Sequence, residues 1–175
     1  MRPSNLLMRR ASLEDLPAMP AMPVGYSLHV CEEGEIDSLA NLLRAAFEDE
    51  NWNVEKAREA LIDAEDVKTT HVITHNGQVI ATASSRLLPN DYPGSGYLHW
   101  VASHPQYRGQ RLGYIISLAV LHEFVELGCS DAVLETQDFR LPAIKTYLNL
   151  DFEPAYRDDT HGGRWEVIRG ELNGS

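Results

Sequence analysis

The fold of this chain is decided by the stretch His104-Pro105-Gln106-Tyr107-Arg108-Gly109-Gln110-Arg111-Leu112-Gly113. A β-prone segment at 97–103 precedes it, and a long apolar segment at 112–127 follows it. This order predicts a strand, a glycine-containing turn and the start of a helix. The first N–H groups of a helix have no intrahelical partner, and the helix dipole adds partial positive charge there. The stretch therefore predicts an anion site that suits a diphosphate, with Arg108 and Arg111 as cationic donors.

The segments around this turn predict an α/β chain. Apolar residues recur at helical spacing in 35–47 and 54–65. The long apolar segment 112–127 and the segment 141–150 are also predicted helices, and Gly128 is expected to cap the third helix. Asn76-Gly77 is a strong hairpin signal. The predicted strands are 26–30, 69–75, 78–87, 97–103, 131–136, 152–156 and 164–168, the last two joined by a polar turn at 158–163. The order β-α-α-β-β-β-α-β-α-β-β predicts a mixed, mostly antiparallel central sheet flanked by helices.

The length of 175 residues predicts one domain. Residues 1–25 contain four prolines, so we expect an extended or loosely packed leader with a short turn at 12–16. The domain is predicted to cover 26–169, followed by a tail at 170–175. The sequence Leu6-Leu7-Met8 is too short for a signal-peptide core. No apolar run approaches the roughly 20 residues of a membrane span, so we expect a cytoplasmic protein without a membrane partner.

Charge and cysteine content exclude other classes. The net charge of −11 argues against nucleic-acid binding, which requires a basic face. The two cysteines, Cys31 and Cys129, have no metal-type spacing, so we predict no metal and two buried thiols. Between Tyr26 and Asp66, twelve acidic residues face three basic ones, a net charge of −9. This segment is either a pair of solvated helix faces or a negative lip that attracts a cationic substrate.

Two segments carry a family resemblance. Val101-Ala102-Ser103-His104-Pro105-Gln106-Tyr107-Arg108-Gly109-Gln110-Arg111-Leu112-Gly113 is similar to an acyl-CoA signature in which Arg or Gln is followed by x-x-Gly-x-Gly/Ala. Ala143-Ile144-Lys145-Thr146-Tyr147-Leu148-Asn149-Leu150-Asp151-Phe152 is similar to a late helix with an Ala-Ile pair, a Tyr and Leu-Gly-Phe. In this order, and over about 26–168, the chain resembles the GNAT superfamily of acyl-CoA-dependent N-acyltransferases.

The resemblance implies an acyl-CoA co-substrate, with acetyl-CoA favoured, and an amine acceptor. In the family the strand before the turn separates from its neighbour, and the gap accepts the pantetheine arm. Backbone N–H groups around Ala102 and Ser103 are then the candidates to hold the oxyanion. Pairing of late strands across subunits occurs in the family, so a homodimer is one expected state. The residues expected to bind the co-substrate are Val101, Ala102, Ser103, Arg108, Gly109, Gln110, Arg111, Leu112, Gly113 and Tyr114.

Direct attack of an amine on a thioester calls for an acid and a base. Tyr147 falls on the family's Tyr position, and a phenol is protonated at neutral pH and can donate to the leaving sulfur. Glu135 and His99 are the candidate bases, with Glu135 preferred and Asp138 as a third choice. Strand alternation places His99 and Val101 on the face opposite Trp100 and Ala102.

Three residues depart from the family pattern. Arg111 stands where Gly is usual, and we expect it to adopt ordinary backbone dihedrals with its guanidinium outward or toward a phosphate. Arg140 replaces an Asn three residues before Ala143. Asp151 replaces the Gly before Phe152, and Asp tolerates the left-handed region, so the turn should survive.

The sequence thus predicts transfer of an acyl group, with acetyl favoured, from acyl-CoA to a primary amine of a small or peptidic acceptor. The acidic first half favours cationic acceptors such as a polyamine, an aminoglycoside or a lysine side chain. The alternative is a sensor that binds acyl-CoA on the same fold without turnover. A nucleotide hydrolase is disfavoured because the chain has no Gly-x4-Gly-Lys-Ser/Thr loop.

Overall fold

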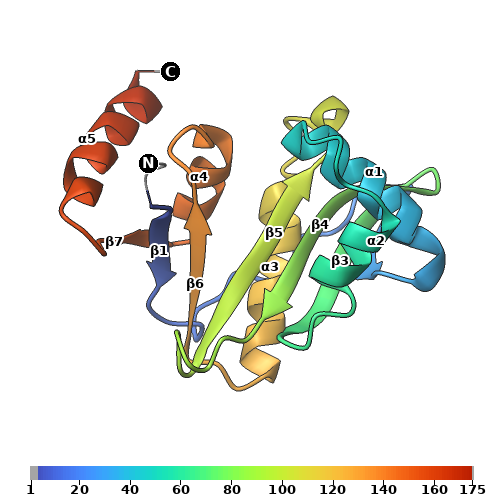
Figure 1. Cartoon of the computed structure of the whole chain (residues 1–175), viewed down its shortest axis with the longest axis horizontal. Helices are drawn as coiled ribbons and strands as arrows, with labels where there is room; N and C mark the ends of the chain where they lie inside the picture. Colours follow the sequence, from blue (N-terminus) through green and yellow to red (C-terminus); the bar gives the residue numbers. More distant parts are fainter. Residues whose placement is uncertain (1–3, 175) are drawn as a thin grey trace.

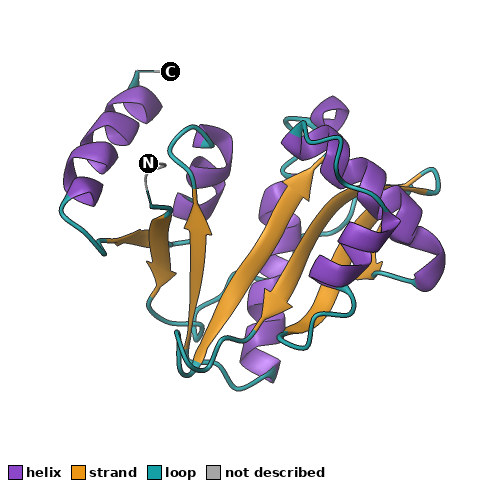
Figure 2. Ribbon diagram, in the orientation of Figure 1, coloured by secondary structure: helices purple, strands orange, loops and turns teal. Residues whose placement is uncertain are grey.

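A computed structural model, which describes residues 4–174, shows one seven-stranded sheet with helices on both faces (Figures 1 and 2). The strand order is β2-β3-β4-β5-β6-β1-β7, and every neighbouring pair is antiparallel except β5 and β6. This mixed, mostly antiparallel sheet confirms the predicted fold class. The strands are β1 Leu6–Arg10, β2 Tyr26–Val30, β3 Val67–His75, β4 Gln78–Arg86, β5 Ser95–Ser103, β6 Asp131–Thr136 and β7 Glu153–Ala155. The helices are α1 Ile36–Phe47, α2 Val54–Leu61, α3 Leu112–Glu126, α4 Leu141–Leu148 and α5 Thr160–Asn173, with 3₁₀ turns at Glu33–Glu35 and Pro105–Tyr107.

The sheet divides the apolar core into two layers. On one face α3 and α4 pack in a large cluster that includes Phe124 and Ile144, both fully buried. On the other face α1 and α2 pack in a second cluster around Leu39 and Trp52. Within the described residues, no helix is long and apolar enough to cross a membrane.

Most central elements lie where the sequence predicts them. β2 and β6 have the predicted bounds. Asn76 and Gly77 both have positive φ, at 50° and 74°, as a tight two-residue hairpin requires. Gly128 has a φ of 76° just after α3, which is the expected left-handed cap. Two helices end earlier than predicted, α2 at Leu61 and α4 at Leu148.

The N-terminal segment corrects the expectation of a loosely packed leader. β1 lies inside the sheet, paired with β6 on one side and β7 on the other. Leu6 and Met8 are fully buried, and the Nε of Arg10 donates to the carbonyl of Leu150 at 3.0 Å. A five-residue strand of two leucines, a methionine and two arginines has too little alternation to be read from sequence. Residues 1–3 lie outside the described residues, and the division into leader, domain and tail stays a prediction.

The C-terminal segment corrects a second expectation. Residues 164–168, predicted to be a strand, lie in helix α5, and the predicted turn at 158–163 already contains its first residues. β7 therefore pairs with β1 instead of a final strand. His161, Trp165 and Ile168 are buried at helical spacing. Three glycines in the helix (Gly162, Gly163 and Gly170) weaken its helical signal, so tertiary burial decides the outcome. Residue 175 of the predicted tail lies outside the described residues.

The cysteines also differ from expectation. Cys31 and Cys129 are free and half-buried rather than fully buried. Burial raises the pKa of both thiols, that of Cys31 to about 11 with help from neighbouring glutamates. A raised pKa keeps these thiols protonated at neutral pH, which makes them poor nucleophiles.

Candidate active site

β5 and β6 separate after a short paired stretch. Only Ser95, Gly96 and Tyr97 of β5 pair with β6, although β5 continues to Ser103 (Figure 1). Beyond that point the edge of β5 that faces β6 has no strand partner. Two cavities open along this separation, one of about 780 Å³ and one of about 520 Å³. We call the larger the cofactor groove and the smaller the acceptor cavity, after the roles proposed for them below.

A bulge in β5 shapes the floor of the acceptor cavity. Trp100 has a φ of 47°, and the register with β4 shifts between the pairs Ser84–His99 and Thr82–Ala102. Two residues of β5, Trp100 and Val101, therefore stand opposite one residue of β4. This corrects the strict alternation predicted for the strand, because His99, Trp100 and Val101 all line the same cavity.

The cofactor groove gathers the predicted co-substrate residues. Its lining includes Val101, Ala102, Ser103, Arg108, Gly109, Arg111, Leu112, Gly113 and Tyr114, with α4 forming the opposite wall. Gln110 is the predicted residue that does not line it. Its side chain accepts a hydrogen bond from the Tyr26 hydroxyl at 2.6 Å instead.

The start of α3 offers backbone donors to this groove. The first intrahelical hydrogen bond runs from Ile115 N to Arg111 O, and no side chain caps the helix. The N–H groups of the first turn are thus free for an anion. Among residues 4–174, neither Arg108 nor Arg111 has an ion-pair partner. Free N–H groups beside two unmatched guanidinium groups suit a diphosphate.

Arg111 does not have the ordinary dihedrals expected from the sequence. Its φ is 58° and its ψ is 23°, which is left-handed backbone, and its guanidinium lies 4.5 Å from the centre of the Tyr114 ring. The turn reverses the chain just before α3, and Gly109 adopts positive φ there as well. A side chain in this region is strained by about 1 kcal/mol.

We therefore expect the Arg111→Gly variant to be more stable than Arg111→Ala, by about 1 kcal/mol. Both substitutions remove the guanidinium, but only Gly relieves the left-handed backbone. Urea denaturation of the two variants measures this difference directly. Equal stability would mean that the turn relaxes to negative φ when the Arg side chain is removed.

The acceptor cavity brings together the three predicted catalytic residues. Tyr147 from α4, Glu135 from β6 and His99 from β5 all line it. Tyr147 is 7% exposed, and its ring packs against Phe152 at 6.1 Å between centroids. Burial raises the pKa of its phenol well above the usual range, so the hydroxyl is protonated at any physiological pH.

Glu135 is held in a polar network. Its carboxylate accepts hydrogen bonds from Arg157 Nη1 at 2.9 Å and from the Tyr92 hydroxyl at 3.0 Å. Asn5 Nδ2 lies 3.4 Å from its second oxygen. Burial raises the pKa of Glu135, but the hydrogen bonds and the charge of Arg157 outweigh burial and lower it. An ion-paired carboxylate with a lowered pKa is a weak base.

The other two candidate bases differ in their surroundings. Burial, and then the charge of Arg86, lower the pKa of His99 to about 4, so its ring is neutral at pH 7 and binds protons weakly. Asp138 forms an ion pair with Arg164 and lines neither cavity. Of the three candidate bases, His99 and Glu135 thus line the acceptor cavity, whereas Asp138 is paired with Arg164 outside it.

Several cavity residues escape sequence reasoning. Trp52, in the loop between α1 and α2, is 1% exposed yet forms part of the wall, with its ring 4.9 Å from that of Trp100. Phe47 joins this cluster at 5.2 Å from Trp100. Arg140 lines both cavities. The signal for the two aromatic residues was weak, because aromatic residues near helix ends are usually core residues. Arg140 stood out only as a departure from the family pattern.

The two cavities meet at four residues. Phe47, Val101, Arg140 and Ala143 line both of them. The carbonyl carbon of a thioester bound along the cofactor groove would therefore lie where the acceptor cavity begins. Within the described residues no group of three His, Cys, Asp or Glu side chains is placed to hold a metal ion.

Comparison with known proteins identifies the family. A family model described as the acetyltransferase (GNAT) family matches residues 36–152, more than half of the chain. A mycothiol acetyltransferase from Nocardia farcinica is 33% identical over 69 residues, which are 39% of this chain and 23% of that protein. The chain matches less than half the length of each of two curated relatives.

Solved structures share the fold. The ribosomal-protein-S18-alanine N-acetyltransferase of Escherichia coli has a TM-score of 0.62 at 20% identity, over 75% of this chain and 79% of that chain. An aminoglycoside N-acetyltransferase in complex with CoA has a TM-score of 0.65 at 15% identity, over 79% of this chain and 95% of that chain. At these identities the likeness establishes the common architecture.

Proposed function

The chain belongs to the GNAT acetyltransferase family, and from that premise we propose that it transfers an acetyl group from acetyl-CoA to a primary amine. The observation that carries the proposal is the meeting of the cofactor groove and the acceptor cavity at Phe47, Val101, Arg140 and Ala143. An amine in the cavity would face a thioester in the groove. Holding both reactants in line lowers the entropic part of the barrier.

In the cofactor groove, the uncapped start of α3 would bind the diphosphate together with Arg108 and Arg111. The pantetheine arm would lie along the free edge of β5. Because N–H groups of consecutive strand residues point to opposite edges, one of the N–H groups of Ala102 and Ser103 faces that free edge. That group is the proposed donor to the oxyanion.

In the acceptor cavity, Tyr147 is proposed to donate a hydrogen bond to the leaving sulfur. His99 is proposed to pass the amine proton to solvent through water, because its neutral ring, unlike the carboxylate of Glu135, is in no ion pair within residues 4–174. Glu135 is proposed to anchor Arg157 and Tyr92, neither of which lines the cavity, because its ion pair makes it a poor base. This reverses the order of preference that the sequence suggested for the two bases.

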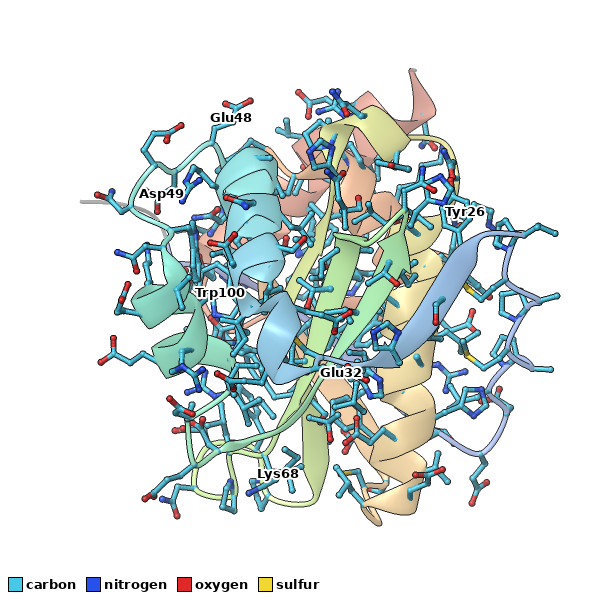
Figure 3. All side chains as sticks on the ribbon, turned by 90° about the vertical axis from the view of Figure 1, so that its right-hand side faces the viewer. Tyr26, Glu32, Glu48, Asp49, Lys68 and Trp100 are labelled. Atoms are coloured by element: carbon cyan, nitrogen blue, oxygen red, sulfur yellow. The ribbon has the colours of Figure 1, made fainter. Side chains whose placement is uncertain are left out.

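The proposed acceptor is cationic. Glu48 and Asp49 follow α1 (Figure 3). Glu48 lines the cofactor groove and Asp49 lines the acceptor cavity. Several carboxylates of residues 26–66 form ion pairs. Their partners are the three basic residues already included in the segment's net charge of −9, and Arg86. Asp49 is paired with Lys56 at 3.0 Å, whereas Glu48 has no ion-pair partner within residues 4–174. The segment as a whole keeps a net negative charge, which would attract a cation.

We expect release of free CoA from acetyl-CoA to be faster with polyamines, aminoglycosides or lysine peptides than with amines that are uncharged at the assay pH. Lowering the salt from about 0.5 M to about 0.05 M should raise kcat/KM for the cationic amines by about threefold or more, because screening weakens. A thiol-release assay measures both. Equal rates for all the amines, without a salt effect, would contradict the proposal of a cationic acceptor. Tight acetyl-CoA binding with no thiol release from any amine would favour the sensor.

A further inference from the structure

Arg140 occupies an unusual position at the junction of the two cavities. It precedes α4 and lines both the cofactor groove and the acceptor cavity. Its guanidinium lies between two aromatic rings, 4.7 Å from the centre of Phe47 and 5.1 Å from the centre of Phe139. Its Nε donates to Gln137 Oε1 at 3.0 Å. These contacts hold the cation in place without neutralising it.

The positive charge of Arg140 has no carboxylate partner within residues 4–174. The side chain is half-buried, and this burial lowers its pKa. Taking a cation out of water costs free energy unless an anion compensates. A half-buried, unmatched guanidinium at a reaction junction therefore indicates that an anion forms there.

Arg140 shares a face with the proposed acid. Ala143 and Tyr147 follow it by three and seven residues, so all three lie on one side of α4, and all three line the acceptor cavity. The charge of Arg140 acts on the Tyr147 phenol and partly opposes the effect of burial on its pKa. The other ionisable groups of the cavity are Asp49, His99 and Glu135 on neighbouring elements, with Tyr97 beside them.

Tyr147 alone cannot neutralise the leaving group. An alkyl thiol has a pKa of about 8.5, whereas burial places the pKa of the Tyr147 phenol well above 10. Full proton transfer from Tyr147 would create a buried tyrosinate and is uphill. Tyr147 can give the sulfur a hydrogen bond, but the negative charge needs a cation.

We infer that Arg140 is a further catalytic residue, which binds the CoA thiolate as the thioester breaks. This rests on the proposed acetyl transfer. The amine nitrogen bonds to the carbonyl carbon, and the carbon–sulfur bond breaks with its electron pair on sulfur. The amine proton leaves to water or His99. The thiolate remains charged beside Arg140 until solvent protonates it as CoA departs.

The test compares CoA with desulfo-CoA, which lacks the thiol. We measure the dissociation constant of each for the full chain by calorimetry from about pH 6.5 to about pH 9.5. If Arg140 lowers the pKa of the bound thiol by about one unit, the dissociation constant of CoA should fall by about tenfold relative to that of desulfo-CoA as pH rises past about 8.5. Below the pKa of the bound thiol the two ligands should keep a constant ratio. The desulfo-CoA arm cancels every other titrating group of the site.

Three variants sharpen the test. In Arg140→Gln the ratio of the dissociation constants of CoA and desulfo-CoA should not change with pH. The fold decrease in kcat should exceed the fold increase in KM for acetyl-CoA. Arg140→Lys should recover part of the pH dependence, because the charge remains without the planar guanidinium. Lys145→Gln is the matched control, because it removes a cation from the exposed face of the same helix and should behave as the wild type.

A flat ratio in the wild type, or a pH-dependent ratio that survives in Arg140→Gln, would overturn the role of Arg140 while leaving the proposed transfer intact. Failure of both CoA and desulfo-CoA to bind would overturn the proposed function as well. The two failures are therefore distinguishable in one titration series.

Discussion

Replacing Tyr147 with Phe is expected to lower kcat about 100-fold or more, with KM for acetyl-CoA nearly unchanged. The hydroxyl is the proposed donor to the leaving sulfur, whereas the ring is a packing element that Phe preserves. The side chain is 7% exposed and packs against Phe152, so the fold should not suffer. Steady-state kinetics with a saturating amine, together with the melting temperature, separates the two contributions.

Tyr156→Phe is the matched control for this prediction. Tyr156 is 56% exposed, lines neither cavity, and its hydroxyl contacts only Arg169 among the hydrogen bonds of residues 4–174. Its loss should leave kcat unchanged. If Tyr147→Phe turned over at the wild-type rate, water would have to supply the hydrogen bond to sulfur, and Tyr147 would be a packing residue of the cavity wall.

Replacing Gly96 with Ala is expected to destabilise the protein by about 3 kcal/mol. Gly96 lies in the short stretch where β5 pairs with β6, and its φ is not in the left-handed region. A Cβ there would come under 3.0 Å from three ring atoms of Phe124, which is fully buried in α3. The ring cannot move aside in a close-packed core, so steric overlap dominates the effect. Urea unfolding measures the loss.

Gly170→Ala provides the comparison, because a Cβ in that part of α5 meets no atom within 4 Å. It should stabilise the protein by about 0.5–1 kcal/mol through helix propensity. A second variant, Gly96→Ala combined with Phe124→Leu, should recover part of the stability lost in Gly96→Ala. If Gly96→Ala were as stable as the wild type, α3 would be free to shift away from the sheet.

The centre of the chain was predictable because local signals and tertiary packing agree there. Asn76 and Gly77 make a tight hairpin wherever they occur between strands, and the long apolar segment of α3 forms a largely buried helix. The predictions for the two ends of the chain were wrong for the opposite reason. β1 has no alternation of its own, and α5 contains three glycines, so each depends on the neighbours that bury it.

The site divides in the same way. The turn at 104–113 was readable because an anion site at a helix start is built from consecutive residues, and seven of these ten residues line the cofactor groove. The acceptor cavity joins residues of α4, β5, β6 and the loop after α1. Its properties come from contacts between distant segments, such as Arg157 with Glu135, which changes that carboxylate from a candidate base into half of an ion pair.

By itself, the sequence determined the strand–turn–helix at 104–113 and the mixed sheet, because these follow from periodicity and from turn chemistry within short segments. It indicated the family through the resemblance of two short motifs. Only the tertiary structure decided that Arg111 has positive φ, that β5 bulges at Trp100, and that Arg140 stands unpaired where two cavities meet. Those outcomes depend on which distant side chains and strand edges surround a residue, and local spacing carries no record of that.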